Sequence, residues 1–322
     1  MDSIEGKKVL VTGGAGFIGY NLSLALSRKG AETRVVDNLS SQGSLERMKK
    51  LNSHKIFTVV ADIRHRHKIA SLSKDCDVIF HLAAMASVPL SVKRPQYDCQ
   101  VNVVGTVNVF EAARLTDAKI VFASSSAVYG TPTKIPIPEN HQLKPISFYG
   151  LTKVVDEFYC EAYHETHGLQ VVSLRLFNVY GPEARMGVTY DFLKKLWKDN
   201  KRLEVIGDGE QSKDFIYVDD VVRAFLAASQ IEKANGEAYN VGSGDSIKVK
   251  DLAYKTVDRL GLSDKTDIVC GVTPTWIGDV KYTKADLTKA RSELKWKPKI
   301  DHNSGLDNAI RWFESAYGKI TR

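Results

Sequence analysis

Short apolar runs alternate with helix-length amphipathic segments through the first half of the chain. The runs, rich in β-branched residues, are KVLVT, TRVVD, IFTVV, DVIFHLA, KIVFAS and VVSLRLF. Strands that alternate with helices pair in parallel, and strands buried on both faces read as continuous apolar runs. The pattern therefore predicts an α/β fold of Rossmann type, a doubly wound parallel sheet covered by helices on both faces.

The alternation loosens after about residue 178. A helix is expected around YDFLKKLWK, then a short strand LEVI, a glycine-rich turn GDGEQ and several later helices. The helix and strand patterns of residues 215–242 suit a return to the main sheet. We therefore expect one domain formed by residues 1–178 together with 215–242, and a smaller α/β substrate lobe formed by 179–214 and 243–322.

Composition narrows the class of protein. The 322 residues are 43% apolar and 26% charged, which is ordinary for a globular chain. No run of about 18 apolar residues occurs, and the N-terminus leads directly into the first strand, so a cytoplasmic protein that does not enter a membrane is expected. Cys76, Cys99, Cys160 and Cys270 lie far apart and are expected to be reduced packing residues, with no metal site.

The net charge of +7 raises the possibility of an acidic partner. Positive charge is concentrated only in RHRHK, residues 64 to 68, and no aromatic stacking platform accompanies it. A solvated helix start is the better interpretation, and nucleic acid is not expected as a partner.

A glycine-rich turn joins the first strand to the first helix in KVLVTGGAGFIGYNLSLALSRKG, with glycines at 13, 16 and 19. Glycine allows a tight turn and lets a pyrophosphate approach the N-terminus of a helix, where free N–H groups favour negative charge. In its strand and helix context, the turn predicts a dinucleotide-binding site.

The second strand ends at Asp37, 18 residues after Gly19. A carboxylate there binds the adenosine ribose hydroxyls and repels a 2′-phosphate, and no arginine follows in the next three residues, so NAD is favoured over NADP. Asp62 and Ile63 are expected to end the third strand beside the adenine, with a solvated turn as the alternative.

Tyr149 and Lys153 lie four positions apart in FYGLTKVVDEFY, whose apolar spacing predicts a helix. A phenol has a pKa near 10 and is a poor base at neutral pH. A cation about 6 Å away is worth about 2 to 3 kcal/mol at an effective dielectric of 20, so Lys153 could lower that pKa, and a second cation would lower it further. For this pair alone, an aromatic beside a solvated lysine is the simpler interpretation.

Taken together, the motifs resemble those of the extended short-chain dehydrogenase/reductase family, specifically its NAD-dependent nucleotide-sugar epimerases and dehydratases. The resemblance covers nearly the whole chain. It rests on TGGAGFIG (12 to 19), VVDNLS (35 to 40), HLAA (81 to 84), NVVGT (102 to 106), SSSAVYG (124 to 130), YGLTK (149 to 153), RLFNVYGP (175 to 182), GDGEQSKDFIYVDD (207 to 220) and GDVKYTKADLTKA (278 to 290).

The resemblance implies three catalytic residues. Ser125 would hydrogen-bond the reacting sugar oxygen, with Ser124 and Ser126 as neighbours; Tyr149 would be the acid/base; and Lys153 would hold the nicotinamide ribose and lower the tyrosine pKa, with the oxidised nicotinamide as second cation. It also implies NAD contacts from Gly13, Gly16, Phe17, Ile18, Gly19, Asp37, Asn38, Ser40, Asp62, Ile63, Leu82, Ala83, Ala84, Asn102, Tyr149, Lys153 and Phe177. Substrate contacts are implied for Ser87, Ser125, Ser126, Asn178, Arg185, Val188, Ile206, Lys213, Asp279 and Thr283.

The implied reaction is 4-epimerisation of a UDP-sugar through a 4-keto intermediate. Dehydratases and decarboxylases of the family use an acidic residue just after the catalytic serine, where this chain has Ser126 and Ala127. Another NAD-dependent sugar-nucleotide modifier, including a UDP-glucuronate epimerase or decarboxylase, and a non-catalytic dinucleotide sensor stay open as alternatives. Two usual diphosphate arginines are replaced by Lys213 and Trp276. Arg185 could compensate or meet a substituent on the sugar, with a solvated loop arginine as the simpler interpretation.

Two further expectations come from the resemblance. Thr283 is small where a bulky aromatic would exclude N-acetyl groups, so UDP-GlcNAc and UDP-GalNAc are expected as substrates beside UDP-glucose and UDP-galactose. Helices around residues 102 to 115 and 149 to 165 are where the resembling enzymes form a homodimer through a four-helix bundle.

Overall fold

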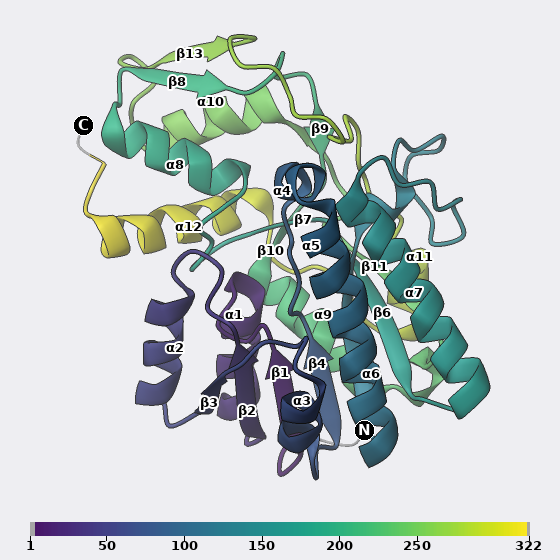
Figure 1. Ribbon diagram of the computed structural model, residues 1–322. Coiled ribbons are helices and arrows are strands. Elements are labelled where there is room, and N and C mark those ends of the chain that lie inside the picture. Colours follow the sequence, from purple (N-terminus) through teal and green to yellow (C-terminus); the bar gives the residue numbers. More distant parts are fainter. Residues whose placement is uncertain (1–3, 321–322) are drawn as a thin grey trace.

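A seven-stranded parallel sheet forms the centre of the computed structural model, which describes residues 4–320 (Figure 1). Every neighbouring pair of strands runs in parallel, in the order β11-β6-β5-β4-β1-β2-β3. The strands are β1 (Lys8–Thr12), β2 (Glu32–Asp37), β3 (Phe57–Val60), β4 (Val78–His81), β5 (Lys119–Ser125), β6 (Val171–Leu176) and β11 (Ala238–Val241). The predicted Rossmann-type fold is confirmed.

Helices cover both faces of this sheet. On one face lie α1 (Phe17–Arg28) and α9 (Val218–Gln230), and on the other lie α3 (Arg66–Ser73), α6 (Gly105–Thr116) and α7 (Phe148–His167). Each face has its own apolar core, and strands such as β4 and β6 are buried along their whole length. Burial on both faces explains why these strands read as largely apolar runs.

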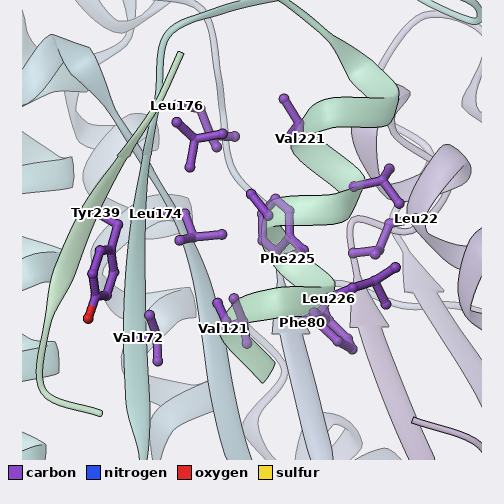
Figure 2. Close-up of a cluster of buried hydrophobic side chains, with 14 of the residues drawn as sticks. Leu22, Phe80, Val121, Val172, Leu174, Leu176, Val221, Phe225, Leu226 and Tyr239 are labelled. Atoms are coloured by element: carbon purple, nitrogen blue, oxygen red, sulfur yellow. The ribbon is translucent and has the colours of Figure 1, made fainter. Parts of the chain in front are cut away.

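Figure 2 shows the core beneath α9, where Phe225 points towards the central strands. Its ring packs edge-to-face against Phe80 of β4, with the centroids 6.3 Å apart. Val121 of β5 and Leu174 of β6 complete the contact surface (Figure 2). These contacts join residues 218–230, which come late in the chain, to the first half of the sheet.

A second group of helices and strands lies above the carboxyl ends of the central strands (Figure 1) and encloses a separate apolar cluster. It is built from α8 (Val188–Lys198), α10 (Val249–Arg259), α12 (His302–Tyr317) and the parallel pair β8 (Arg202–Val205) and β13 (Asp267–Cys270). Two smaller two-stranded sheets connect the regions: β7 (Asn178–Tyr180) with β10 (Phe215–Tyr217), and β9 (Ser212–Lys213) with β12 (Ile247–Lys248).

Short helices complete the chain: α2 (Ser44–Ser53), α4 (Val88–Lys93), α5 (Pro95–Cys99), η1 (Gln100–Val104), η2 (Ser126–Tyr129), η3 (Glu232–Ala234) and α11 (Thr288–Glu293). None of the helices in the described part of the chain is both long enough and apolar enough to span a membrane.

Two details of the sequence-based prediction are wrong. β3 ends at Val60, so Asp62 and Ile63 lie in the loop after the strand instead of ending it. Only two of the four cysteines are packing residues, because Cys99 and Cys270 are exposed while Cys76 and Cys160 are buried. All four are free thiols.

Candidate active site

The glycine turn after β1 leaves no room for side chains. Gly13 has a positive φ of 67°, and a Cβ atom added to it would lie 2.7 Å from the backbone nitrogen of Ala83. A Cβ atom on Gly19 would lie 2.2 Å from the carbonyl oxygen of Gly13. The turn therefore packs directly on the segment after β4, where Leu82, Ala83 and Ala84 follow the strand, and α1 begins at Phe17 and Ile18 immediately after Gly16. This places backbone N–H groups at the N-terminus of α1, where an anion is favoured.

Asp37 lies at the carboxyl end of β2 beside this turn. Its carboxylate accepts hydrogen bonds from the backbone N–H groups of Ala15 (3.1 Å) and Leu39 (2.7 Å). Burial raises the pKa of Asp37, and the two backbone hydrogen bonds oppose that shift. The side chain thereby joins the end of the second strand to the glycine turn.

Arg47 supports the same turn and was missed by the sequence analysis. Its fully buried guanidinium donates to the carbonyl oxygens of Ala15 (2.7 Å), Gln42 (2.9 Å) and Glu183 (3.2 Å). The arginine lies in an amphipathic helix with other basic residues, and only its long-range partners distinguish it from them.

A cavity lies beyond Asp37 and is lined by Asn38, Val60, Ala61, Asp62, His65 and Lys68. Asp62 accepts hydrogen bonds from Asn38 (2.8 Å) and from the guanidinium of Arg64, which together hold the pKa of Asp62 well below its usual range. Ile63 points away from solvent and packs under Gly105 of α6. Ser40 lies in the loop after β2, where its N–H donates to Asn38.

His81 ends β4 and is completely buried. Its two ring nitrogens lie 2.7 Å from the hydroxyl of Thr12 and 3.0 Å from the hydroxyl of Thr106. Burial, with the positive charge of Lys153, lowers the pKa of His81 to about 3, so the imidazole is neutral. It joins β1, β4 and α6 beneath the turn.

Asn102 lies behind the segment after β4. Its amide oxygen accepts from the N–H of Met85 (2.8 Å), and its amide nitrogen donates to Asp98 (3.0 Å) and Thr152 (3.1 Å). The side chain is fully buried, so its polar groups are occupied by the protein. Asn102 holds the backbone beside the glycine turn in place.

Three consecutive serines end β5, and the structure separates them. Ser124 is buried and hydrogen-bonds Glu157, which also pairs with Arg175. Ser125 is half-buried, accepts from the N–H of Ala127 at 3.2 Å and lies close enough to Tyr149 to act on the pKa of that phenol. Ser126 starts η2. Ser125 is therefore the member of the cluster whose side chain reaches the tyrosine.

Tyr149 lies in the first turn of α7, which Ser147 caps by accepting from the N–H of Gly150. Burial and the negative charges of Asp98 and Asp156 raise the pKa of Tyr149 to about 12, and the nearby hydroxyl of Ser125 opposes this. The predicted lowering of this pKa by Lys153, with the oxidised nicotinamide as second cation, stays a prediction. Desolvation is the larger effect because it disfavours the phenolate.

Lys153 lies one helical turn further and is 2% exposed. Its ammonium is 4.4 Å from the centre of the Phe122 ring and 3.6 Å from a carboxylate oxygen of Asp156. Burial lowers the pKa of Lys153, whereas Asp156 raises it. The cation is thus directed along α7 by a carboxylate that the sequence analysis did not single out.

The predicted diphosphate lysine is already paired. Lys213 is buried and donates to Asp279 at 2.7 Å and to the carbonyl of Val280. Thr283 lies on the adjacent segment and is buried, with its hydroxyl accepting from the N–H of Asp214 at 3.1 Å. Trp276 is 40% exposed in the loop before Asp279.

Arg185 lies against α2. Its guanidinium hydrogen-bonds Glu46 and lies 5.6 Å from the centre of the Tyr317 ring. Because Glu46 lies in the first turn of α2, this arginine joins α2 to the region of α12. It is already engaged by a carboxylate of the protein.

The other predicted site residues lie on several different elements. Ser87 caps α4 by accepting from the N–H of Leu90, and Val188 begins α8. Asn178 donates to the carbonyl of Asp214 at 2.9 Å, joining β7 to the β9–β10 segment. Phe177 is buried at the end of β6, and the carbonyl of Ile206 accepts from Gln211.

Comparison with known proteins identifies the family. The family model for GDP-mannose 4,6 dehydratase matches residues 10–309. The chain is 35% identical to a UDP-glucose 4-epimerase from Mycolicibacterium smegmatis over 96% of this chain and 99% of that protein. The chain belongs to this family of nucleotide-sugar epimerases and dehydratases.

Solved structures of family members have the same fold. A UDP-N-acetylglucosamine 4-epimerase from Methanobrevibacter ruminantium in complex with UDP-N-acetylmuramic acid matches with a TM-score of 0.88 and 33% identity, covering 97% of this chain and 99% of that one. A UDP-glucuronic acid 4-epimerase from Bacillus cereus in complex with UDP-glucuronic acid and NAD matches with a TM-score of 0.87 and 30% identity, covering 96% and 100%. These structural neighbours are 4-epimerases of UDP-sugars.

Proposed function

We propose that this family member is an NAD-dependent UDP-sugar 4-epimerase. The observation that carries the proposal is the proximity of Ser125, at the end of β5, to Tyr149 in the first turn of α7, with Lys153 on the same helix face. A hydroxyl donor, an acid/base and a cation are the groups that oxidation at a sugar hydroxyl requires. The relatives that share the fold over the whole chain act on, or bind, UDP-sugars.

NAD fits the groups that the chain presents. The turn at Gly13 and Gly19 has no space for a Cβ atom, as expected where backbone must approach a pyrophosphate. Asp37 places a carboxylate where the adenosine ribose would lie, and the cavity beside Asp62 would hold the adenine. When bound, the oxidised nicotinamide supplies a hydride acceptor and a positive charge.

The proposed catalytic side chains account for the transfer of the proton of the C4 hydroxyl. Tyr149, as phenolate, takes the proton of the C4 hydroxyl while the hydrogen at C4 leaves as hydride, which gives a 4-keto sugar. Ser125 donates a hydrogen bond to the C4 oxygen, and Lys153 stabilises the phenolate. Tyr149 would return the proton to the C4 oxygen when the keto sugar is reduced on its opposite face. The reaction is then an isomerisation with no net oxidation.

The residues after Ser125 favour epimerisation over dehydration. Ser126 and Ala127 offer no carboxylate for a second proton transfer, and η2 begins at this position. We propose UDP-glucose/UDP-galactose and UDP-GlcNAc/UDP-GalNAc as substrates, since Thr283 is small. UDP-glucuronate is a less favoured substrate, because Arg185 is already paired with Glu46.

We further propose a homodimer through α6 and α7. Leu151 and Phe158 on α7 are 48% and 57% exposed, and Val104 and Leu115 beside them on η1 and α6 are 50% and 64% exposed. Large apolar side chains in helical spacing on adjacent helices suit an isologous four-helix seam.

The division into two lobes is part of the same proposal. Residues 1–178 with 215–242 would bind NAD, and residues 179–214 with 243–322 would bind the nucleotide sugar. The separate apolar cluster built from α8, α10 and α12 supports this division. We also place the enzyme in the cytoplasm, where its exposed free thiols at Cys99 and Cys270 would stay reduced.

The function is tested by incubating the purified protein with NAD and a panel of UDP- and GDP-sugars, and following each anomeric proton by NMR. The proposal expects interconversion of C4 epimers of UDP-sugars and no accumulation of NADH. Formation of a 4-keto-6-deoxy or decarboxylated product would assign another reaction of the family. Turnover of GDP-sugars alone would contradict the substrate class.

A further inference from the structure

Asp156 of α7 is a fully buried carboxylate. Within residues 4–320, neither of its oxygens has a hydrogen-bond partner. The opposite charge beside it is the ammonium of Lys153, 3.6 Å away and 2% exposed. A buried charge is costly unless it is paired, so each of these two groups depends on the other to stay ionised.

Asp98 provides an internal comparison. It is also fully buried and its charge also acts on Lys153. Its two oxygens, however, accept hydrogen bonds from Asn102 and Thr152, both at 3.0 Å. Asp98 is therefore satisfied by neutral donors, whereas in the described part of the chain only Lys153 pairs with Asp156.

We infer that Asp156 is a positioning residue that keeps the Lys153 ammonium charged and directed along α7, one helical turn from Tyr149. The inference rests on the proposed function, because it adds Asp156 to the three residues proposed to carry out catalysis. Phe122 assists by placing its ring face 4.4 Å from the ammonium.

Asp156 affects the pKa of Tyr149 in two opposite directions. The charged and titratable groups that face the pair are Asp98 of α5, His81 of β4, and Glu157 and Cys160 of α7. Glu157 is committed to Arg175, and His81 is neutral. Acting directly, the negative charge of Asp156 raises the pKa of Tyr149. Acting through Lys153, it lowers that pKa, because it preserves the cation that stabilises the phenolate.

The test uses Asp156→Asn in the full-length protein saturated with NAD, with Glu161→Gln as matched control. Glu161 is exposed on the same helix, so the control removes one negative charge away from the pair. Two quantities are measured: the pH profile of kcat for epimerisation, and the titration of Lys153 by NMR with ¹³C at the lysine Cε atoms. The Lys153 signal is assigned by its loss in Lys153→Met.

The expected result has two parts. In Asp156→Asn the midpoint of the Lys153 titration falls by about one pH unit or more, and the acid limb of the kcat profile moves to higher pH. In Glu161→Gln both stay within error of the unaltered protein. An acid limb that moves to lower pH, or a Lys153 titration that does not change, would overturn the inference.

Folding is controlled separately. If Asp156→Asn is unstable, the double variant Lys153→Met/Asp156→Asn, which removes both charges, is compared with it. The inference requires a higher Tm for the double variant than for Asp156→Asn. An equal or lower Tm rejects the pairing. Failure of the proposed function can be distinguished from failure of the inference about Asp156. An unaltered protein that epimerises no UDP-sugar would refute the function, while the Lys153 titration would still report on Asp156.

Discussion

Asp37 accepts a hydrogen bond from the backbone N–H of Ala15 at 3.1 Å, across 22 residues of sequence. The carboxylate at the end of β2 thus fixes the turn that follows β1. Since it also accepts from Leu39, the same side chain shapes the turn and carries the charge that would oppose a 2′-phosphate.

Replacing Asp37 is therefore expected to have two effects. Asp37→Ala should narrow the preference for NAD over NADP by about 10-fold or more through loss of charge. It should also lower stability by about 1 to 3 kcal/mol, because the N–H groups of Ala15 and Leu39 lose their acceptor. Asp37→Asn, the matched variant, keeps an oxygen acceptor. It should lose the preference for NAD over NADP but lose less stability than Asp37→Ala. Isothermal titration with both cofactors and urea unfolding measure the two effects. Equal affinity of the unaltered protein for NAD and NADP would contradict the role of Asp37 in cofactor preference.

Tyr149→Phe deletes one oxygen and leaves the ring. Turnover should fall by about 10² to 10⁴, because the positioned acid/base is lost, while NAD affinity stays within a few-fold. Tyr159→Phe is the control, since Tyr159 is 39% exposed on the same helix. The NMR assay of anomeric protons gives the rates, and near full activity of Tyr149→Phe would exclude the assigned role.

Substitutions of Thr283 test which UDP-sugars the enzyme accepts. Thr283→Tyr should suppress turnover of UDP-GlcNAc and UDP-GalNAc by steric overlap and spare UDP-glucose and UDP-galactose. Because Thr283 is buried and accepts from the N–H of Asp214, thermal unfolding must be measured alongside. Thr283→Ser, which keeps a small side chain and the acceptor, should retain all four activities. Equal slowing of every substrate would argue against a gate at this position.

The surface formed by α6 and α7 tests the quaternary structure. Light scattering at micromolar concentration should give a dimer, and Phe158→Arg should shift the mass towards a monomer, since a charge placed in an apolar seam must be desolvated. Phe57→Arg is the control, because Phe57 is 59% exposed on β3, away from these helices. A monomeric unaltered protein would contradict the proposed dimer.

His81 predicts how stability depends on pH. Its pKa is about 3 in the folded protein against about 6.5 in an unfolded chain, so the stability it contributes is complete above pH 6.5 and is lost as the pH falls towards 3. The slope from this group is about 1.4 kcal/mol per pH unit within that window. In urea unfolding from pH 7.5 to 4, His81→Gln should start less stable and lose stability less steeply. His54→Gln, at an exposed histidine, should follow the unaltered protein, and a steep slope in His81→Gln would reject the assignment.

The alternation of strands and helices, the glycine turn and the Tyr149–Lys153 spacing could all be predicted from the sequence. Each is a local property: strands buried on both faces need apolar runs, a tight turn needs glycine, and residues four apart share a helix face. Asp37 at the end of the second strand belongs to the same class. The sequence could not show that β3 ends at Val60, because strand ends depend on pairing with the neighbouring strand.

Only the tertiary structure decided which polar groups are engaged with one another. Ser124 is removed from the site by Glu157, 33 residues later, and Arg185 is paired with Glu46, 139 residues earlier. Asp156 gave no signal in the sequence, because a lone acidic residue on an amphipathic helix is ordinarily solvated. Packing of α7 on the sheet buried it beside Lys153. Local sequence determines backbone periodicity, but the partner of a charged side chain is set by which elements the fold brings together.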